Sequence, residues 1–129
     1  MSIRRVMPNV VAEDLAASKA FYSGFLGLEV RMDEPGFLML CSPSNPTAQL
    51  TVVSGASDWD PNTCRTTMAV EVDDIDAVHA QAKAQGVKIV YPITDEPWGV
   101  RRFFVEAPDG GVINVNSHIR PNPTDQSDS

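Results

Sequence analysis

The chain has 129 residues, of which 43% are hydrophobic and 21% charged, and its formal net charge is −7 at pH 7. This length supports one core but not two large independent domains, and no apolar run approaches the roughly 18 residues of a membrane span. The acidity disfavours nucleic acid as a partner, because phosphate binding needs clustered Lys and Arg, and it favours a cationic or neutral ligand. Alternatively, the acidity only keeps the protein soluble.

The N-terminus lacks the apolar segment of a signal peptide, so we expect a cytoplasmic protein without a membrane partner. Cys41 and Cys64 are the only cysteines, and their spacing fits neither a disulfide scaffold nor a zinc knuckle. We expect both to be reduced packing residues.

Two stretches sixty residues apart, Val10–Ala17 and Val70–Ala77, are similar to each other. Such a repeat indicates one small module used twice. A functional site is then expected between the two copies. We predict a single domain over residues 1–118, with module one over about 3–54, a linker over 55–64 and module two over about 65–118.

Module one reads as βαβββ. Its first strand is predicted over 4–11, and Asp14 is placed to cap a helix. The apolar face of that helix is predicted to consist of Leu15, Ser18, Tyr22 and Phe25. Turn-forming residues separate three further strands, predicted over 27–32, 36–41 and 48–54.

Module two repeats this order. A strand over 66–72 precedes a helix that is capped by Asp74 and closed by Gly86. Ile75, Val78 and Ala82 lie on one side of the helix, and strands follow over 87–91, 100–106 and 111–117. The polar, proline-rich segment 119–129 is predicted to be a disordered tail.

Alternation along the strands divides their residues into two faces. The apolar face, expected to pack under the helices, contains Val6, Pro8, Val10, Leu50, Val52, Met68, Val70, Val72, Ile113 and Val115. The opposite face contains Met7, Asn9, Gln49, Thr51, Thr67, Ala69, Glu71, Asn114 and Asn116. A few neutral hydrogen-bonding groups among apolar ones suit a small-molecule pocket, whereas the alternative is a sheet face satisfied by water.

The strand over 100–106 adds two candidates to this face. If Phe103 faces the helices, Arg102 and Phe104 face the pocket. Aromatic residues expected near the rim are Trp59, Trp98, Phe103 and Phe104, although each is also a candidate for ordinary core or edge packing.

Two segments resemble a known family. The run from Glu13 to Tyr22, followed by Leu26-Gly27-Leu28, resembles the opening of the vicinal oxygen chelate superfamily, which includes glyoxalase I, extradiol dioxygenases, fosfomycin-resistance enzymes and bleomycin-resistance proteins. The run from Trp98 to Gly110 is similar to its strand, Asp-Pro-Asp-Gly turn and final strand, with Ala107 in place of the first Asp. The resemblance covers residues 4–118.

The resemblance implies an α+β fold in which two tandem βαβββ modules form a cupped mixed β-sheet with helices on the outer face, within a homodimer. Metalloenzymes of the superfamily place His and Glu ligands on the first and last strands of each module. The corresponding residues here are Met7, Gln49, Thr67 and Asn114. These neutral, weak donors are unsuited to a divalent cation, so no metal or other cofactor is expected.

The remaining donors do not replace this set. His79 is predicted on the helix surface, and His118 lies beside the tail. Glu71 is predicted to pair with Arg101 or Arg102, or to contact the ligand.

The leading hypothesis is a metal-free small-molecule binding protein that resembles the bleomycin-resistance proteins and sequesters an antibiotic or an aromatic metabolite. No catalytic residue is assigned. The ligand-binding set is Met7, Asn9, Gln49, Thr51, Thr67, Glu71, Trp98, Arg102, Phe104, Asn114 and Asn116. The alternatives are a lyase, isomerase or dioxygenase of the same superfamily, and a dimeric interaction protein with a vestigial pocket.

Overall fold

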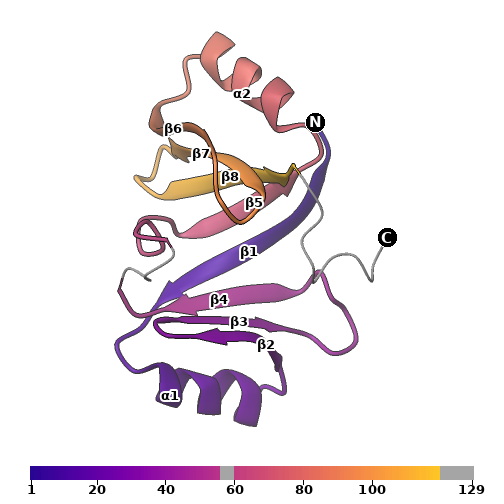
Figure 1. The fold of residues 1–129 in the computed structure, drawn as a ribbon, viewed down its shortest axis with the longest axis vertical. Coiled ribbons are helices and arrows are strands. Elements are labelled where there is room, and N and C mark those ends of the chain that lie inside the picture. The colour runs from indigo at the N-terminus through magenta and orange to yellow at the C-terminus, as the bar shows by residue number, and fades with distance from the viewer. Residues whose placement is uncertain (56–59, 120–129) are drawn as a thin grey trace. The chain divides into compact units, whose positions relative to one another are not determined.

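The computed structural model describes residues 1–55 and 60–119 (Figure 1). Over these residues the secondary-structure elements are β1 (Ile3–Val11), α1 (Leu15–Lys19), the π-helical turn η1 (Ala20–Phe25), β2 (Glu29–Glu34), β3 (Phe37–Cys41), β4 (Gln49–Val53), β5 (Met68–Val72), α2 (Ile75–Ala84), β6 (Ile89–Asp95), β7 (Val100–Glu106) and β8 (Val112–His118). The order βαβββ therefore occurs twice, as predicted. Trp59 and residues 120–129 of the predicted tail lie outside the described residues.

The chain divides into two compact units. Arg5–Ala69 form the first, and Met1–Arg4 form the second together with the described residues from Val70 onward. The hydrogen-bonded strand order is β2-β3-β4-β1 in the first unit and β5-β8-β7-β6 in the second. β1 pairs with β4 in parallel, whereas β2–β3, β3–β4, β6–β7 and β7–β8 are antiparallel. The predicted α+β class with a mixed sheet is confirmed.

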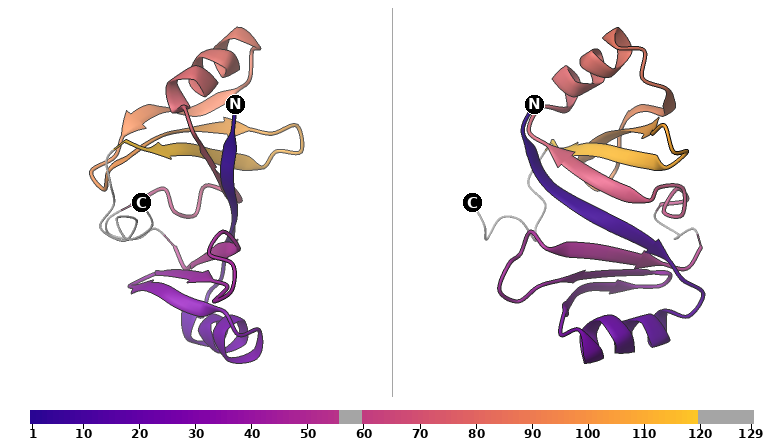
Figure 2. Two further views of the ribbon diagram at one scale, coloured as in Figure 1. Left: turned by 90° about the vertical axis from the view of Figure 1, so that its right-hand side faces the viewer. Right: turned by 180° about the vertical axis from the view of Figure 1, so that it is seen from behind.

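The helix of module one begins at its predicted cap. The Asp14 side chain accepts a hydrogen bond from the Ala17 N–H at 3.0 Å, which satisfies one of the unpaired donors of the first turn. Leu15 and Tyr22 pack against Leu38, Leu40 and Val52, three of the buried residues of β3 and β4. Figures 1 and 2 show each helix beside the strands of its own unit.

The predicted apolar face of this helix is wrong at Phe25, which is 75% exposed. The cause is η1, in which the Leu26 N–H donates to the Phe21 carbonyl five residues earlier. A π turn holds more residues than an α turn, so it rotates the positions that follow away from a 3.6-residue stripe. Phe21 is also exposed, and the centres of the Phe21 and Phe25 rings lie 5.6 Å apart.

In module two, Asp74 caps α2 by accepting from the Ala77 N–H at 3.1 Å, and Gly86 ends the helix segment with a φ of 70°. The predicted helix face is confirmed. Ile75, Val78 and Ala82 form a core with Val72, Phe103 and Val115. His79 is half-buried rather than fully at the surface. Its ring packs edge-to-face with that of Phe103, and the ring centres lie 4.9 Å apart.

The division of strand residues into two faces is largely confirmed. Val10, Leu50 and Val52 join the core of the first unit, and Val70, Val72, Ile113 and Val115 join that of the second. The division is wrong at Val6, Pro8 and Met68, which are exposed. The helices pack mainly on other strands, α1 on β3 and β4 and α2 on β7 and β8, so these positions of β1 and β5 are not covered.

The two free cysteines match the expectation of reduced packing residues, with Cys41 buried and Cys64 partly buried. Over the described residues no helix is long and apolar enough to cross a membrane.

We predict that Asp74→Ala lowers the free energy of unfolding by about 1 kcal/mol, because the Ala77 N–H loses its acceptor. Urea denaturation followed by circular dichroism measures the change. Asp74→Asn keeps a capping oxygen and is expected to lose much less. Equal losses for the two variants would contradict a capping role.

Candidate functional site

The sheet face of the second unit that points away from α2 carries polar and aromatic side chains. Val72, Phe103 and Val115 pack with α2, so their neighbours along the strands point to the opposite side. These neighbours are Glu71 on β5, Arg102 and Phe104 on β7, and Asn114, Asn116 and His118 on β8. We call this set the far face, together with Tyr91 of β6 and Trp98 of the turn before β7.

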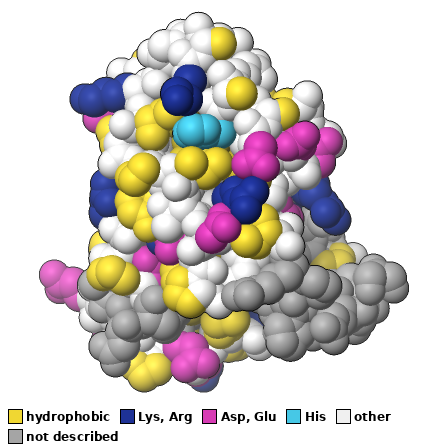
Figure 3. Space-filling model, turned by 45° about the horizontal axis from the view of Figure 1, so that its top comes forward, with side chains coloured by type: hydrophobic (Ala, Val, Ile, Leu, Met, Phe, Trp, Pro, Cys, Tyr) yellow, Lys and Arg dark blue, Asp and Glu magenta, His cyan; other side chains and the backbone are white. Residues whose placement is uncertain are grey.

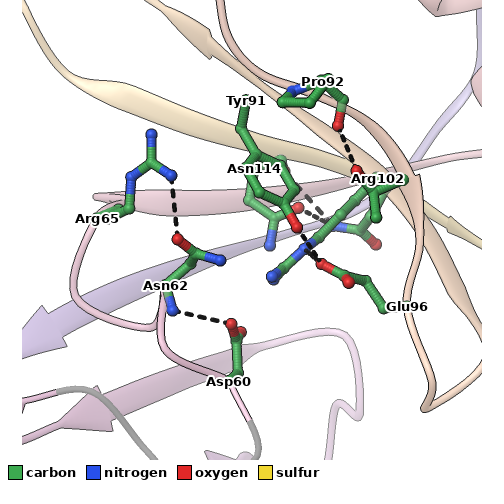
Figure 4. A network of polar contacts seen from close by, with 10 residues as sticks. Asp60, Asn62, Arg65, Tyr91, Pro92, Glu96, Arg102 and Asn114 are labelled. Atoms are coloured by element: carbon green, nitrogen blue, oxygen red, sulfur yellow. Dashed lines mark hydrogen bonds and ion pairs between the residues drawn. The ribbon is translucent and has the colours of Figure 1, made fainter.

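A buried ion pair lies at the centre of the far face (Figure 4). Arg102 Nε contacts Glu96 Oε2 at 2.6 Å, and the two side chains are only 5% and 9% exposed. The Tyr91 hydroxyl donates to the same carboxylate oxygen at 2.9 Å. Because a buried charge is unfavourable without a partner, the contact with Glu96 stabilises the Arg102 charge.

Three aromatic rings enclose the Arg102 guanidinium. Its central carbon lies 4.9 Å from the ring centre of Phe104, 5.0 Å from that of Trp98 and 5.4 Å from that of Tyr91. Tyr91 and Phe104 also stack, with their ring centres 4.5 Å apart. These distances are within the range of cation–π attraction.

Tyr91 reaches this cluster because β6 is irregular. The register between β6 and β7 shifts between Ile89 and Tyr91, and again between Tyr91 and Thr94. Such irregularities redirect a side chain at the cost of regular pairing. The ring of Tyr91 consequently lies over Phe104, its partner in the ladder.

The two asparagines lie opposite this cluster on β8. Arg102 pairs with Asn116 and Phe104 with Asn114 in the β7–β8 register. Asn116 Nδ2 donates to Asn114 Oδ1 at 3.2 Å, which fixes the relative orientation of the two amides. Asn116 is buried, whereas Asn114 is half-buried, so part of the amide pair is accessible.

Glu71 and His118 form a second polar pair. His118 Nδ1 lies 2.7 Å from Glu71 Oε2, and the side chains are 25% and 7% exposed, respectively. The sequence suggested Arg101 or Arg102 as the partner of Glu71. In the structure Arg102 contacts Glu96, and Arg101 contacts Asp76 and Asp95.

Arg101 points to the opposite side of the sheet from Arg102. Its hydrogen bond to Asp95 and the nearby charges of Asp76 and Asp95 raise its pKa. Figure 3, which brings the α2 end of Figure 1 forward, shows basic and acidic side chains in contact among scattered apolar ones. Two adjacent arginines therefore have different roles, one linking α2 to the β6–β7 turn and one buried on the far face.

The candidate residues of module one have local partners. Asn9 Nδ2 donates to the Thr63 and Thr66 carbonyls at 2.7 and 2.8 Å, and Asn9 Oδ1 accepts from the Thr51 hydroxyl at 2.6 Å. These bonds use three of the four that an Asn side chain can make. Asn9 and Thr51 thus hold the segment that follows the linker.

Three further candidates, all in the first unit, are placed differently. Gln49 accepts from Arg5 at 3.3 Å and donates to the Pro46 carbonyl at 2.7 Å. Met7 is half-buried and Thr67 is exposed. The structure leaves the ligand role of these residues a prediction.

The residues present do not fit the metal that the superfamily implies. Met7, Gln49, Thr67 and Asn114 offer a thioether, two amides and a hydroxyl, none of which is an anionic or imidazole donor. Over residues 1–55 and 60–119, no group of three or more His, Cys, Asp or Glu side chains is arranged to hold an ion.

The sequence reasoning missed Tyr91, Glu96 and His118. One signal for Glu96 was present: an arginine within the apolar strand Val100–Val105 needs a buried carboxylate, and the preceding turn supplies Asp95 and Glu96. The position of Tyr91 had no such signal, because the alternation of residue types along β6 does not reveal where its pairing with β7 becomes irregular.

Comparisons with known proteins agree with this fold. The Glyoxalase/Bleomycin resistance protein/Dioxygenase superfamily model matches residues 3–115. No match was found among curated proteins. A superfamily member from Vibrio splendidus 12B01 is 18% identical, with a TM-score of 0.69 over 90% of this chain and 99% of that one.

Two further solved structures are similar. Methylmalonyl-CoA epimerase from Mycobacterium tuberculosis is 20% identical, with a TM-score of 0.70 over 95% of this chain and 91% of that one. The Mn(II)-bound glyoxalase from Novosphingobium aromaticivorans is 23% identical, with a TM-score of 0.64 over 93% of this chain and 40% of that one. At these identities the likeness concerns the fold alone.

We predict that Glu96→Gln destabilises the protein by about 3 kcal/mol, because it removes a carboxylate that pairs with the buried Arg102 guanidinium. Glu106→Gln is the matched control: Glu106 pairs with Lys88 at the surface, and its loss is expected to cost under about 1 kcal/mol. Chemical denaturation of both variants gives the comparison. Similar losses of stability in the two variants would show that the buried Arg102–Glu96 pair contributes no more than a surface ion pair.

Proposed function

The chain belongs to the Glyoxalase/Bleomycin resistance protein/Dioxygenase superfamily, and on this premise we propose that it is a small-molecule binding protein that holds its ligand without a metal ion. The ligand class proposed is an antibiotic or an aromatic metabolite. The observation that carries the proposal is the chemistry of four positions, Met7, Gln49, Thr67 and Asn114, none of which supplies a strong metal donor.

The far face supports binding rather than a purely structural role for module two. It combines half-buried aromatic rings, Tyr91 and Trp98, with a half-buried amide, Asn114. Sites for small molecules are mostly apolar and aromatic, with a few oriented polar groups. The Asn116–Asn114 hydrogen bond supplies such orientation before any ligand arrives.

The groups needed for a reaction are less complete. Acyl or proton transfer requires a base, a group that orients it and donors for developing charge. The buried Glu71 contacts His118, and Arg102 contacts Glu96. Both pairs stabilise the charges of the folded protein, so binding accounts for the far face more simply than catalysis.

Two further expectations from the sequence stay proposals. We propose that the protein acts as a homodimer, as the superfamily resemblance implies, and that it is cytoplasmic. Size-exclusion chromatography with light scattering measures the first, and fractionation of cells the second.

The test of the proposed function combines metal analysis with ligand binding. Protein purified without chelator is expected to contain much less than one divalent ion per chain by mass spectrometry. A thermal-shift panel of planar aromatic amides, including benzamide and indole-3-acetamide, is expected to give compounds that raise the melting temperature equally with and without EDTA, because a ligand of the folded state stabilises it.

Asn114→Ala is expected to weaken the affinity of these amides about tenfold, which corresponds to the loss of one hydrogen bond. Gln81→Ala removes an exposed amide on α2 and serves as the control, with no change expected. A stoichiometric divalent ion whose removal abolishes ligand binding would overturn the proposal in favour of a metal-dependent lyase, isomerase or dioxygenase.

A further inference from the structure

Three aromatic rings around a cation are the usual means by which proteins recognise cationic ligands. In this chain the rings of Tyr91, Trp98 and Phe104 have that arrangement, with distances of 5.4, 5.0 and 4.9 Å from their centres to one guanidinium carbon. The guanidinium is that of Arg102, so the cation inside this aromatic cage belongs to the protein itself.

The occupant is firmly held. Glu96 contacts Arg102 Nε at 2.6 Å, and the Tyr91 hydroxyl donates to the same carboxylate at 2.9 Å. Tyr91, one of the three rings of the cage, is therefore hydrogen-bonded to the residue that pairs with Arg102. Arg102 is 4% exposed and Phe104 is fully buried. An external cation could enter only by expelling a buried, paired charge, which is strongly unfavourable.

We infer that Arg102 fills the cation site of the far face and thereby makes the face select uncharged planar ligands over cationic ligands of the same shape. This inference rests on the proposed function, since it names the ligand class of the same site. Arg102 is on this account a specificity-determining residue, and Glu96 keeps it in place.

The charges around the cage agree with this selection. The Arg102 charge is balanced by Glu96, and the Glu71 carboxylate lies against His118 at 2.7 Å. The Asn114 amide of the same face is half-buried and neutral, and it can both donate and accept. An uncharged ligand with an amide or a similar group matches it without disturbing either pair.

The selection is local, because the chain as a whole favours cations. Its net charge of −7 attracts positive ions to the surface and would raise the local concentration of a cationic ligand. The proposed selection against cations therefore depends on the occupied cage and not on the overall charge of the chain.

Benzamide and benzamidine test the inference because they share size and planarity but differ in charge. The wild-type protein is expected to bind benzamidine at least tenfold more weakly than benzamide in titrations followed by NMR of the protein. Arg102→Ala empties the cage and is expected to gain at least tenfold in affinity for benzamidine. Methylguanidinium, which replaces the missing group, is expected to raise the melting temperature of Arg102→Ala.

Arg101→Ala is the matched control. It removes the same side chain one residue earlier, on the opposite side of the sheet, and is expected to show neither a gain in affinity for benzamidine nor a response to methylguanidinium. If Arg102→Ala fails to fold, Arg102→Met keeps most of the stem volume and is used in the same titrations. The wild-type comparison requires no variant.

Wild-type protein that binds benzamidine as tightly as benzamide would overturn the inference, and so would a folded Arg102 variant that gains no affinity for benzamidine. If the wild type binds neither compound, the proposed binding function fails and the selection of uncharged ligands fails with it, even if Arg102→Ala binds benzamidine. If the wild type binds both equally, the binding function stands and the selection alone is overturned.

Discussion

The far face depends on one buried interaction, the ion pair between Arg102 and Glu96. A guanidinium that is 5% exposed needs a countercharge, and the nearest source is the turn that connects β6 to β7. Glu96 therefore fixes this turn over the sheet, and with it Trp98, whose ring contacts the guanidinium. Tyr91 is drawn in from β6 by its hydrogen bond to the same carboxylate. One charge thus positions three side chains, two from the turn and one from β6.

Adjacent residues of β7 face opposite sides of the sheet and have different roles, because strand side chains alternate. Arg101 and Phe103 face α2, where Arg101 joins Asp76 of the helix to Asp95 at the end of β6, and Phe103 fills the core. Arg102 and Phe104 face the other way. A shift of one residue in the register would turn Arg102 toward the apolar core under α2 and Phe103 toward the far face, so these two side chains favour the observed register of the strand.

Features that depend on local chemistry or alternation were predictable from the sequence. Asp14 and Asp74 are caps because a short acceptor stands before an amphipathic run, and Phe103 faces α2 because its strand alternates. Features that depend on a departure from regular geometry were not. The π turn that exposes Phe25 and the irregular pairing that places Tyr91 over Phe104 both break the periods from which side-chain direction is inferred. The Glu71–His118 contact depends on strand pairing between distant segments, which the residues themselves do not encode.

The two copies of the module use corresponding positions differently. In module one, Asn9 and Thr51 face each other across the β1–β4 ladder, and their hydrogen bonds are directed to each other and to the segment after the linker. Sixty residues later Ala69 stands in place of Asn9, and Asn116 of β8 donates to Asn114 on its own strand. The polar groups of module one are consequently used to hold the chain, whereas the amide of Asn114 stays accessible beside an aromatic cluster. A duplicated fold can in this way keep one backbone plan while only one copy retains groups suited to a ligand.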